Sequence, residues 1–166
     1  MQYMSLNVFL SYSTTIEEQV VVWRLQTLAA AHGISLYVPA REGFKALGNR
    51  TPVLPGRVEQ AIQKCDCVLA IITSRTSRIV ERELNYALGK DKLIIPIIDI
   101  SITDPRLLQR FNPVFRFNPN APTNDVESQV IAFLKQQQLS KENRKALGAL
   151  VAIGLGMLAL STLAEK

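Results

Sequence analysis

Residues 67–98 contain the stretch that decides the fold: CVLAIIT at 67–73, SRIVERELNYA at 77–87 and LIIPII at 93–98. The first and third runs are almost continuously apolar, which is typical of strands buried on both faces of a parallel sheet. The middle run has the spacing of a helix, and it carries a carboxylate, Glu83, between the two strands. This order predicts parallel strands that are covered by a helix.

The same alternation continues in both directions along the chain. The other elements that we expect are a strand at 6–10, a helix at 17–31, a strand at 34–38, a short helix at 57–64, a helical or turn segment at 104–110, an edge strand at 114–117 and a last helix at 125–137. Together they predict an α/β fold of the flavodoxin-like, doubly wound type, with a mainly parallel five-stranded sheet.

Length and charge limit the possible organisation. A chain of 166 residues suits one domain and an appendage, so we expect a globular domain at 1–137, a basic linker at 138–145 and a transmembrane helix at 146–164. The net charge is +5, but the sequence has no dense basic stripe interleaved with aromatic residues. We therefore expect no nucleic-acid partner.

The C-terminal segment 146–164 has 19 residues without a charge. At about 1.5 Å per residue, such a helix nearly spans the ~30 Å hydrocarbon core of a bilayer. Basic residues precede it, which predicts a single-pass membrane protein with its globular domain in the cytoplasm. Gly148, Ala152 and Gly156 are four residues apart and favour self-association of this helix. The alternative is an apolar helix that docks on another subunit.

The doubly wound topology also predicts where a ligand binds. Ligands of such sheets lie beyond the carboxyl ends of the strands, where the strand order reverses, here between the first and third strands. The polar residues at this edge are Ser11, Tyr12 and Ser13 after the first strand and Thr73, Ser74 and Ser77 after the third. Glu83 follows on the next helix, and the long loop at 39–55 is expected to act as a gate beside the site.

Three motifs together resemble one family. VFLSYS at 8–13, PG at 55–56 with AI at 61–62, and the run from Ser77 to Leu88 resemble the TIR (Toll/interleukin-1 receptor) family over residues 6–135. With the C-terminal segment, the chain resembles a prokaryotic-type TIR protein with a membrane anchor. The resemblance implies an enzyme that cleaves NAD at the nicotinamide–ribose bond by hydrolysis or cyclisation, in antiviral defence or immune signalling.

The resemblance also implies roles for particular residues. Glu83 matches the family's catalytic glutamate, NAD is the substrate and no separate cofactor is needed. Family members also self-associate through the TIR domain. The family often has a tryptophan four residues before its glutamate, where this chain has Ile79, and an acidic residue three after the Ser-Tyr-Ser motif, where it has Ile16. Both departures bear on substrate affinity, and Ile79 is the main argument for a non-enzymatic TIR adaptor or scaffold.

Simpler roles remain open for these residues. Glu83 could be a solvated helix residue, and Ser11, Tyr12 and Ser13 could be turn residues that satisfy backbone groups. Glu81 is the weaker catalytic candidate because it is on a different face of the helix.

Other reactive residues point to structural roles. The single histidine, His32, precedes a glycine and is expected at a helix C-terminus. Cys65 and Cys67 have no second pair of ligands for zinc, so we expect buried thiols in a reducing compartment and no metal site. The N-terminus has no basic region before its apolar run, and it does not read as a secretory signal. A phosphoacceptor domain would need an aspartate where Thr73 ends the third strand.

Overall fold

The structure is a computed structural model that describes residues 5–40, 53–74, 76–121 and 125–142. It alternates strands and helices as the sequence predicts. The elements are β1 (Asn7–Ser11), α1 (Ile16–Ala31), β2 (Ser35–Tyr37), α2 (Gly56–Lys64), β3 (Cys67–Ile72), α3 (Arg78–Gly89), β4 (Leu93–Asp99), α4 (Pro105–Leu108), β5 (Phe115–Phe117) and α5 (Val126–Glu142).

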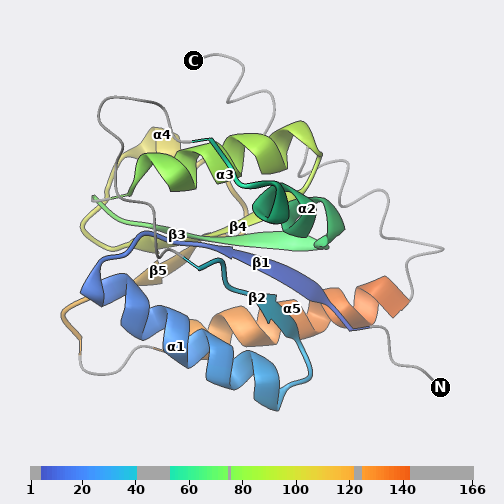
Figure 1. Cartoon of the computed structure of the whole chain (residues 1–166). Helices are drawn as coiled ribbons and strands as arrows, with labels where there is room; N and C mark the ends of the chain where they lie inside the picture. The colour runs from blue at the N-terminus through green and yellow to red at the C-terminus, as the bar shows by residue number, and fades with distance from the viewer. Residues whose placement is uncertain (1–4, 41–52, 75, 122–124, 143–166) are drawn as a thin grey trace.

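The five strands form one sheet in the order β2-β1-β3-β4-β5, and every neighbouring pair is parallel. The order reverses between β1 and β3, as predicted. Figure 1 shows α1 and α5 on one face of the sheet and α2 and α3 on the other. The doubly wound α/β prediction is therefore confirmed, and the carboxyl ends of β1 and β3 lie side by side.

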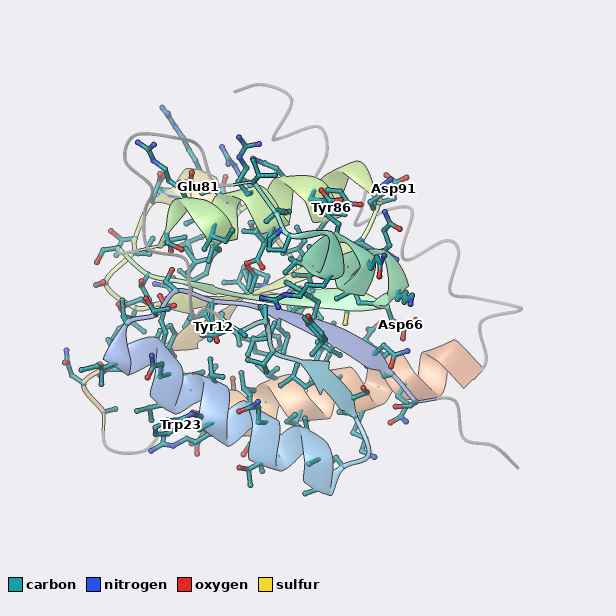
Figure 2. The ribbon with its side chains drawn as sticks, viewed as in Figure 1. Tyr12, Trp23, Asp66, Glu81, Tyr86 and Asp91 are labelled. Atoms are coloured by element: carbon teal, nitrogen blue, oxygen red, sulfur yellow. The ribbon has the colours of Figure 1, made fainter. Side chains whose placement is uncertain are left out.

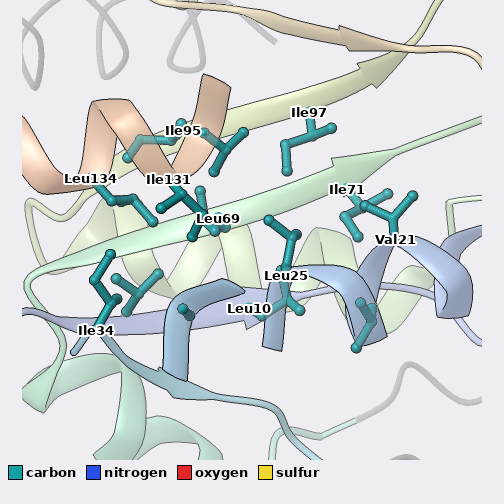
Figure 3. Close-up of a cluster of buried hydrophobic side chains, with 14 of the residues drawn as sticks. Leu10, Val21, Leu25, Ile34, Leu69, Ile71, Ile95, Ile97, Ile131 and Leu134 are labelled. Atoms are coloured by element: carbon teal, nitrogen blue, oxygen red, sulfur yellow. The ribbon is translucent and has the colours of Figure 1, made fainter. Parts of the chain in front are cut away.

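Each face of the sheet packs its own apolar core. The larger core lies between the sheet and the α1–α5 pair, with Leu25, Leu69, Ile97 and Leu134 among its fully buried side chains (Figure 3). The second core lies under α2 and α3. Because both faces are covered, the central strands read as apolar runs rather than as alternating ones.

The ends of α1 follow from local sequence signals. Thr15 is the N-cap, and its hydroxyl accepts a hydrogen bond from the backbone N–H of Glu18 at 3.4 Å. His32 is the C-cap, as predicted, and Gly33 follows it at φ +69°, a left-handed conformation that glycine adopts without steric cost. These signals fix where α1 starts beside the end of β1.

The main boundary difference is at the C-terminal end, where α5 continues five residues past the predicted end and reaches Glu142. The predicted transmembrane segment 146–164 lies outside the described residues, as does the central part of the predicted gate, 41–52. Within the described part of the chain, no helix has both the length and the apolar character to cross a membrane.

Candidate functional site

The carboxyl edge of the sheet between β1 and β3 gathers polar side chains from four segments. Ser11 is the last residue of β1, and Ser77 is the N-cap of α3, which follows β3. The N-terminal turn of α1 and the loop after β3 complete this edge. The chain returns to the edge after each parallel strand, so residues more than sixty positions apart in sequence meet here.

Glu83 lies inside this edge and is fully buried, with 0% of its surface exposed. Its Oε1 accepts a hydrogen bond from the hydroxyl of Ser11, also fully buried, at 2.9 Å. Ile79, Val80 and Ala87 share the buried face of α3 with it. The alternative that Glu83 is a solvated helix residue is therefore wrong, whereas Glu81 is exposed on the outer side of α3 (Figure 2).

A second buried carboxylate, Glu18, was not singled out from the sequence. It is also 0% exposed, and it lies in the first turn of α1. Its Oε2 accepts from the backbone N–H of Ser13 at 2.5 Å, and its Oε1 accepts from the hydroxyl of Thr73 at 2.7 Å. Glu18 thus joins the loops that follow β1 and β3. The pattern Thr15-x-x-Glu18 is a capping-box sequence and is the signal that could have found it.

Hydrogen bonds also tie the loop after β1 to the start of α3. The Ser13 hydroxyl accepts from the backbone N–H of Ser77 at 2.8 Å and donates to the Ser77 hydroxyl at 3.2 Å. In the loop after β3, the Thr76 hydroxyl accepts from the Thr73 N–H at 2.9 Å and donates to the Thr73 carbonyl at 2.8 Å. These bonds fix the backbone on both sides of the Ser11–Glu83 pair.

The predicted site residues divide into two groups. Ser11, Ser13, Thr73 and Ser77 all lie at the edge: Ser11 bonds to Glu83, Ser13 and Ser77 bond to each other, and Ser13 and Thr73 bond to Glu18. The others are placed differently: the Tyr12 hydroxyl donates to the Pro39 carbonyl at 3.0 Å, Ser74 is exposed, and Ile79 is 9% exposed on the buried face of α3. The Tyr12 bond ties β1 to the segment after β2.

The arrangement suits recognition of hydroxyl groups and of positive charge. A buried carboxylate is acceptor-only when ionised, and a hydroxyl donor such as Ser11 satisfies one of its oxygens. No group of His, Cys, Asp and Glu residues that could hold a metal ion exists in the described ranges. The hydrogen bonds of Ser11 and Thr73 to the two carboxylates show that this edge offers hydrogen bonding by carboxylates and hydroxyls.

The fold and this polar edge define a doubly wound α/β domain with its site at the switch point of the sheet. The model of the TIR domain family matches residues 8–142, so the chain belongs to the TIR domain family. Among curated proteins, none matches the chain.

Two solved structures are similar to this chain at low identity. The TIR domains of the activated Roq1 resistosome, which directly recognizes the pathogen effector XopQ, are 14% identical, with a TM-score of 0.48, covering 95% of this chain and 83% of that one. The CMP N-glycosidase BcmB of Clostridium botulinum is 18% identical, with a TM-score of 0.48, covering 78% of this chain and 98% of that one.

Proposed function

We propose that this protein is a membrane-anchored TIR enzyme that cleaves NAD at the nicotinamide–ribose bond, by hydrolysis or cyclisation to an ADP-ribose-type product. Glu83 is the proposed catalytic residue, and Ser11, Ser13, Thr73 and Ser77 line the proposed substrate edge together with Tyr12, Ser74 and Ile79. The proposed role is that of prokaryotic-type TIR proteins in antiviral defence or immune signalling.

One observation carries the proposal: Glu83 is fully buried at the carboxyl edge of the sheet and accepts a hydrogen bond from Ser11. Burying a carboxylate is unfavourable, and an apolar residue at this position of α3 would pack without that cost. A buried carboxylate at the switch point of a doubly wound sheet is therefore a functional candidate on physical grounds. Membership of the TIR family adds support, because the resemblance of the run from Ser77 to Leu88 to that family implies that Glu83 is its glutamate.

The proposed chemistry needs only one carboxylate. When the bond between ribose C1′ and nicotinamide breaks, its electron pair leaves with the nicotinamide, which departs as a neutral molecule. Positive charge then develops on the ribose, and a carboxylate that bonds the ribose hydroxyls stabilises this charge more than it stabilises the ground state. Water attacks C1′ and releases a proton in hydrolysis, whereas another atom of the same molecule attacks in cyclisation.

Access to Glu83 requires an opening step in this proposal. The Ser11 hydroxyl occupies Oε1, where a ribose hydroxyl would bind, and the carboxylate has no exposed surface. Substrate therefore has to displace Ser11 from Oε1 after the covering side chains move. We propose that self-association, through the TIR domain and the predicted helix at 146–164, favours the open state by raising the local concentration of domains at a membrane.

The experiment compares NAD consumption by the full chain on liposomes at high surface density, with products identified by mass. Glu83→Gln is expected to lower turnover about 100-fold or more, since that is the usual cost of losing one electrostatic stabiliser. The matched control, Glu81→Gln, changes an exposed carboxylate on the same helix and should leave turnover unchanged. Equal turnover in both variants would refute the role of Glu83.

A non-enzymatic adaptor is the second candidate, and the surface of α1 favours it. Ile16, Val20 and Trp23 are 78%, 39% and 65% exposed, and their spacing places them on one face of α1. Figure 2 shows Trp23 on the side of α1 that faces away from the sheet. An exposed apolar stripe of this kind suits contact between TIR domains. No turnover on crowded membranes, combined with self-association that Trp23→Glu abolishes, would favour the adaptor.

A further inference from the structure

A groove of about 410 Å³ lies at the end of the sheet opposite the candidate site. Asn7 and Ser35, which start β1 and β2 and pair in register, line one end of the groove. The Asp66 carboxylate accepts from the Asn7 N–H at 2.8 Å, and Figure 2 shows Asp66 and Tyr12 toward opposite ends of the sheet. The groove is therefore separate from the edge that holds Glu83, and its volume falls in the range of small-molecule sites.

One face of α2 forms the wall opposite the edge strand β2. Arg57, Gln60, Ala61 and Lys64 line the groove at the i, i+3, i+4, i+7 spacing of a single helix face. Val58 and Ile62, on another face of α2, are buried against the sheet. The helix is thus held by its apolar face, and the lining residues are free to contact a ligand.

An aromatic ring forms part of the other wall. Tyr37 is 39% exposed, and its ring stacks on the fully buried Phe9 with 5.6 Å between centroids and 18° between planes. This contact holds the Tyr37 ring in place before any ligand arrives. A ring fixed in this way is a platform for another flat ring, because little side-chain entropy is lost when it binds.

Two cations line the groove, and one carboxylate, that of Asp66, lies at the end that Asn7 lines. Arg57 and Lys64 are exposed, and neither forms an ion pair with a carboxylate of the described residues. No aspartate or glutamate is among the lining residues. The two cations are seven positions apart on the helix, about 10 Å along its axis, so they flank the groove rather than share one point. Such an arrangement attracts an anion, and the guanidinium of Arg57 matches the geometry of a phosphate.

We propose that this groove is a second binding site, for a small aromatic anion of the nucleoside monophosphate class. The base stacks on Tyr37, the phosphate pairs with Arg57 or Lys64, and Gln60, Ser35 and Asn7 offer hydrogen bonds to the sugar. Ala61 and Cys65 provide apolar surface beneath the ligand, whereas the Val8 side chain is buried in the core on the opposite face of the sheet. This site does not depend on NAD cleavage, because it shares no residue with the proposed catalytic edge.

Calorimetric titration of the full chain with AMP, adenosine and inorganic phosphate tests the proposal. AMP should bind saturably at one per chain, and adenosine and phosphate should each bind at least about tenfold more weakly, since each keeps only part of the contacts. Arg57→Gln or Lys64→Gln should weaken AMP binding about tenfold. Tyr37→Leu should weaken AMP and adenosine but leave phosphate unchanged. Arg106→Gln, an exposed arginine on α4, is the matched control.

Two results would overturn the proposal. One is the absence of saturable AMP binding, or binding that neither Arg57→Gln nor Lys64→Gln weakens. The other is AMP binding that disappears with Glu83→Gln, because the nucleotide would then occupy the edge of β1 and β3. Arg57, Lys64, Tyr37 and Arg106 are exposed, whereas Glu83 is buried, so AMP binding is compared only among variants that circular dichroism shows to be folded. Turnover of NAD is not needed for either result.

Discussion

Replacing Glu18 with alanine should destabilise the protein strongly. In the sequence, the capping-box spacing from Thr15 to Glu18 is the signal that points to this residue. Glu18 is fully buried, and its two oxygens accept from the Ser13 backbone N–H at 2.5 Å and from the Thr73 hydroxyl at 2.7 Å. Alanine leaves the Ser13 N–H without this partner at a buried position and the Thr73 hydroxyl without it at a partly buried one. A buried donor that loses its partner costs about 1–3 kcal/mol and a partly buried one less, so we expect the free energy of unfolding to fall by about 1–4 kcal/mol.

Glu18→Gln should destabilise the protein less than Glu18→Ala. Glutamine keeps the shape of the side chain, but one acceptor oxygen becomes an NH₂ group that faces a donor. One hydrogen bond should survive, and the loss should be about 1–3 kcal/mol. The assay is urea unfolding of each full-length variant followed by circular dichroism, with Glu81→Gln as an exposed control that should stay within about 0.5 kcal/mol of the native chain. A loss below about 1 kcal/mol for Glu18→Ala would refute the reasoning.

Two further predictions concern the C-terminal ends of helices α1, α2 and α3. Asp91 follows the C-cap of α3 at φ 55°, so Asp91→Gly should raise the free energy of unfolding by up to about 1 kcal/mol. Gly33 has φ +69°, and although an added Cβ would meet no atom within 4 Å, Gly33→Ala should lower the free energy of unfolding by about 1–2 kcal/mol because of this backbone conformation. Thermal melts in which Asp91→Gly is less stable than the native chain, or Gly33→Ala more stable, would contradict the conformational argument. Burial raises the pKa of the Cys65 thiol to about 11 from 9.0, so the thiol contributes stability that is present below pH 9 and lost as the pH rises to 11. Between pH 9 and pH 11, the free energy of unfolding of the native protein should fall by about 1–2 kcal/mol more than that of Cys65→Ala. One pKa unit corresponds to about 1.4 kcal/mol, and solvent screening reduces the effect. Equal losses of unfolding free energy in the two proteins would contradict the raised pKa of the buried thiol.

The sheet could be predicted because its strands are buried on both faces. The runs at 67–73 and 93–98 contain few polar residues, and only a parallel sheet covered by helices hides such strands. The end of α5 was less predictable. No glycine or proline follows Gln137 before Glu142, and glutamine, leucine and lysine are good helix formers, so the local signal for a stop was absent.

The sequence predicted where the polar site residues lie on the sheet, but it did not predict which of them bond to one another. Topology brought Ser11, Ser13, Thr73 and Ser77 together, because every parallel strand ends at the same side. Topology does not determine which donor meets which carboxylate. The pairing depends on which face of its helix each carboxylate occupies. Glu83 shares the buried face of α3 with Ile79 and Val80, and Glu18 lies in the first turn of α1.

The two buried carboxylates at this edge should separate in function when stability and turnover are measured together. Glu18 joins two loops by accepting from the backbone and from Thr73, so Glu18→Gln should reduce stability, and NAD turnover should fall only as far as the folded fraction falls. Glu83 accepts from a side chain that a substrate hydroxyl can replace, so Glu83→Gln should lower turnover about 100-fold or more with a stability change of about 1–3 kcal/mol at most. If both variants lost stability and turnover in proportion, Glu83 would be a structural residue like Glu18, and the adaptor would be the better account of this TIR protein.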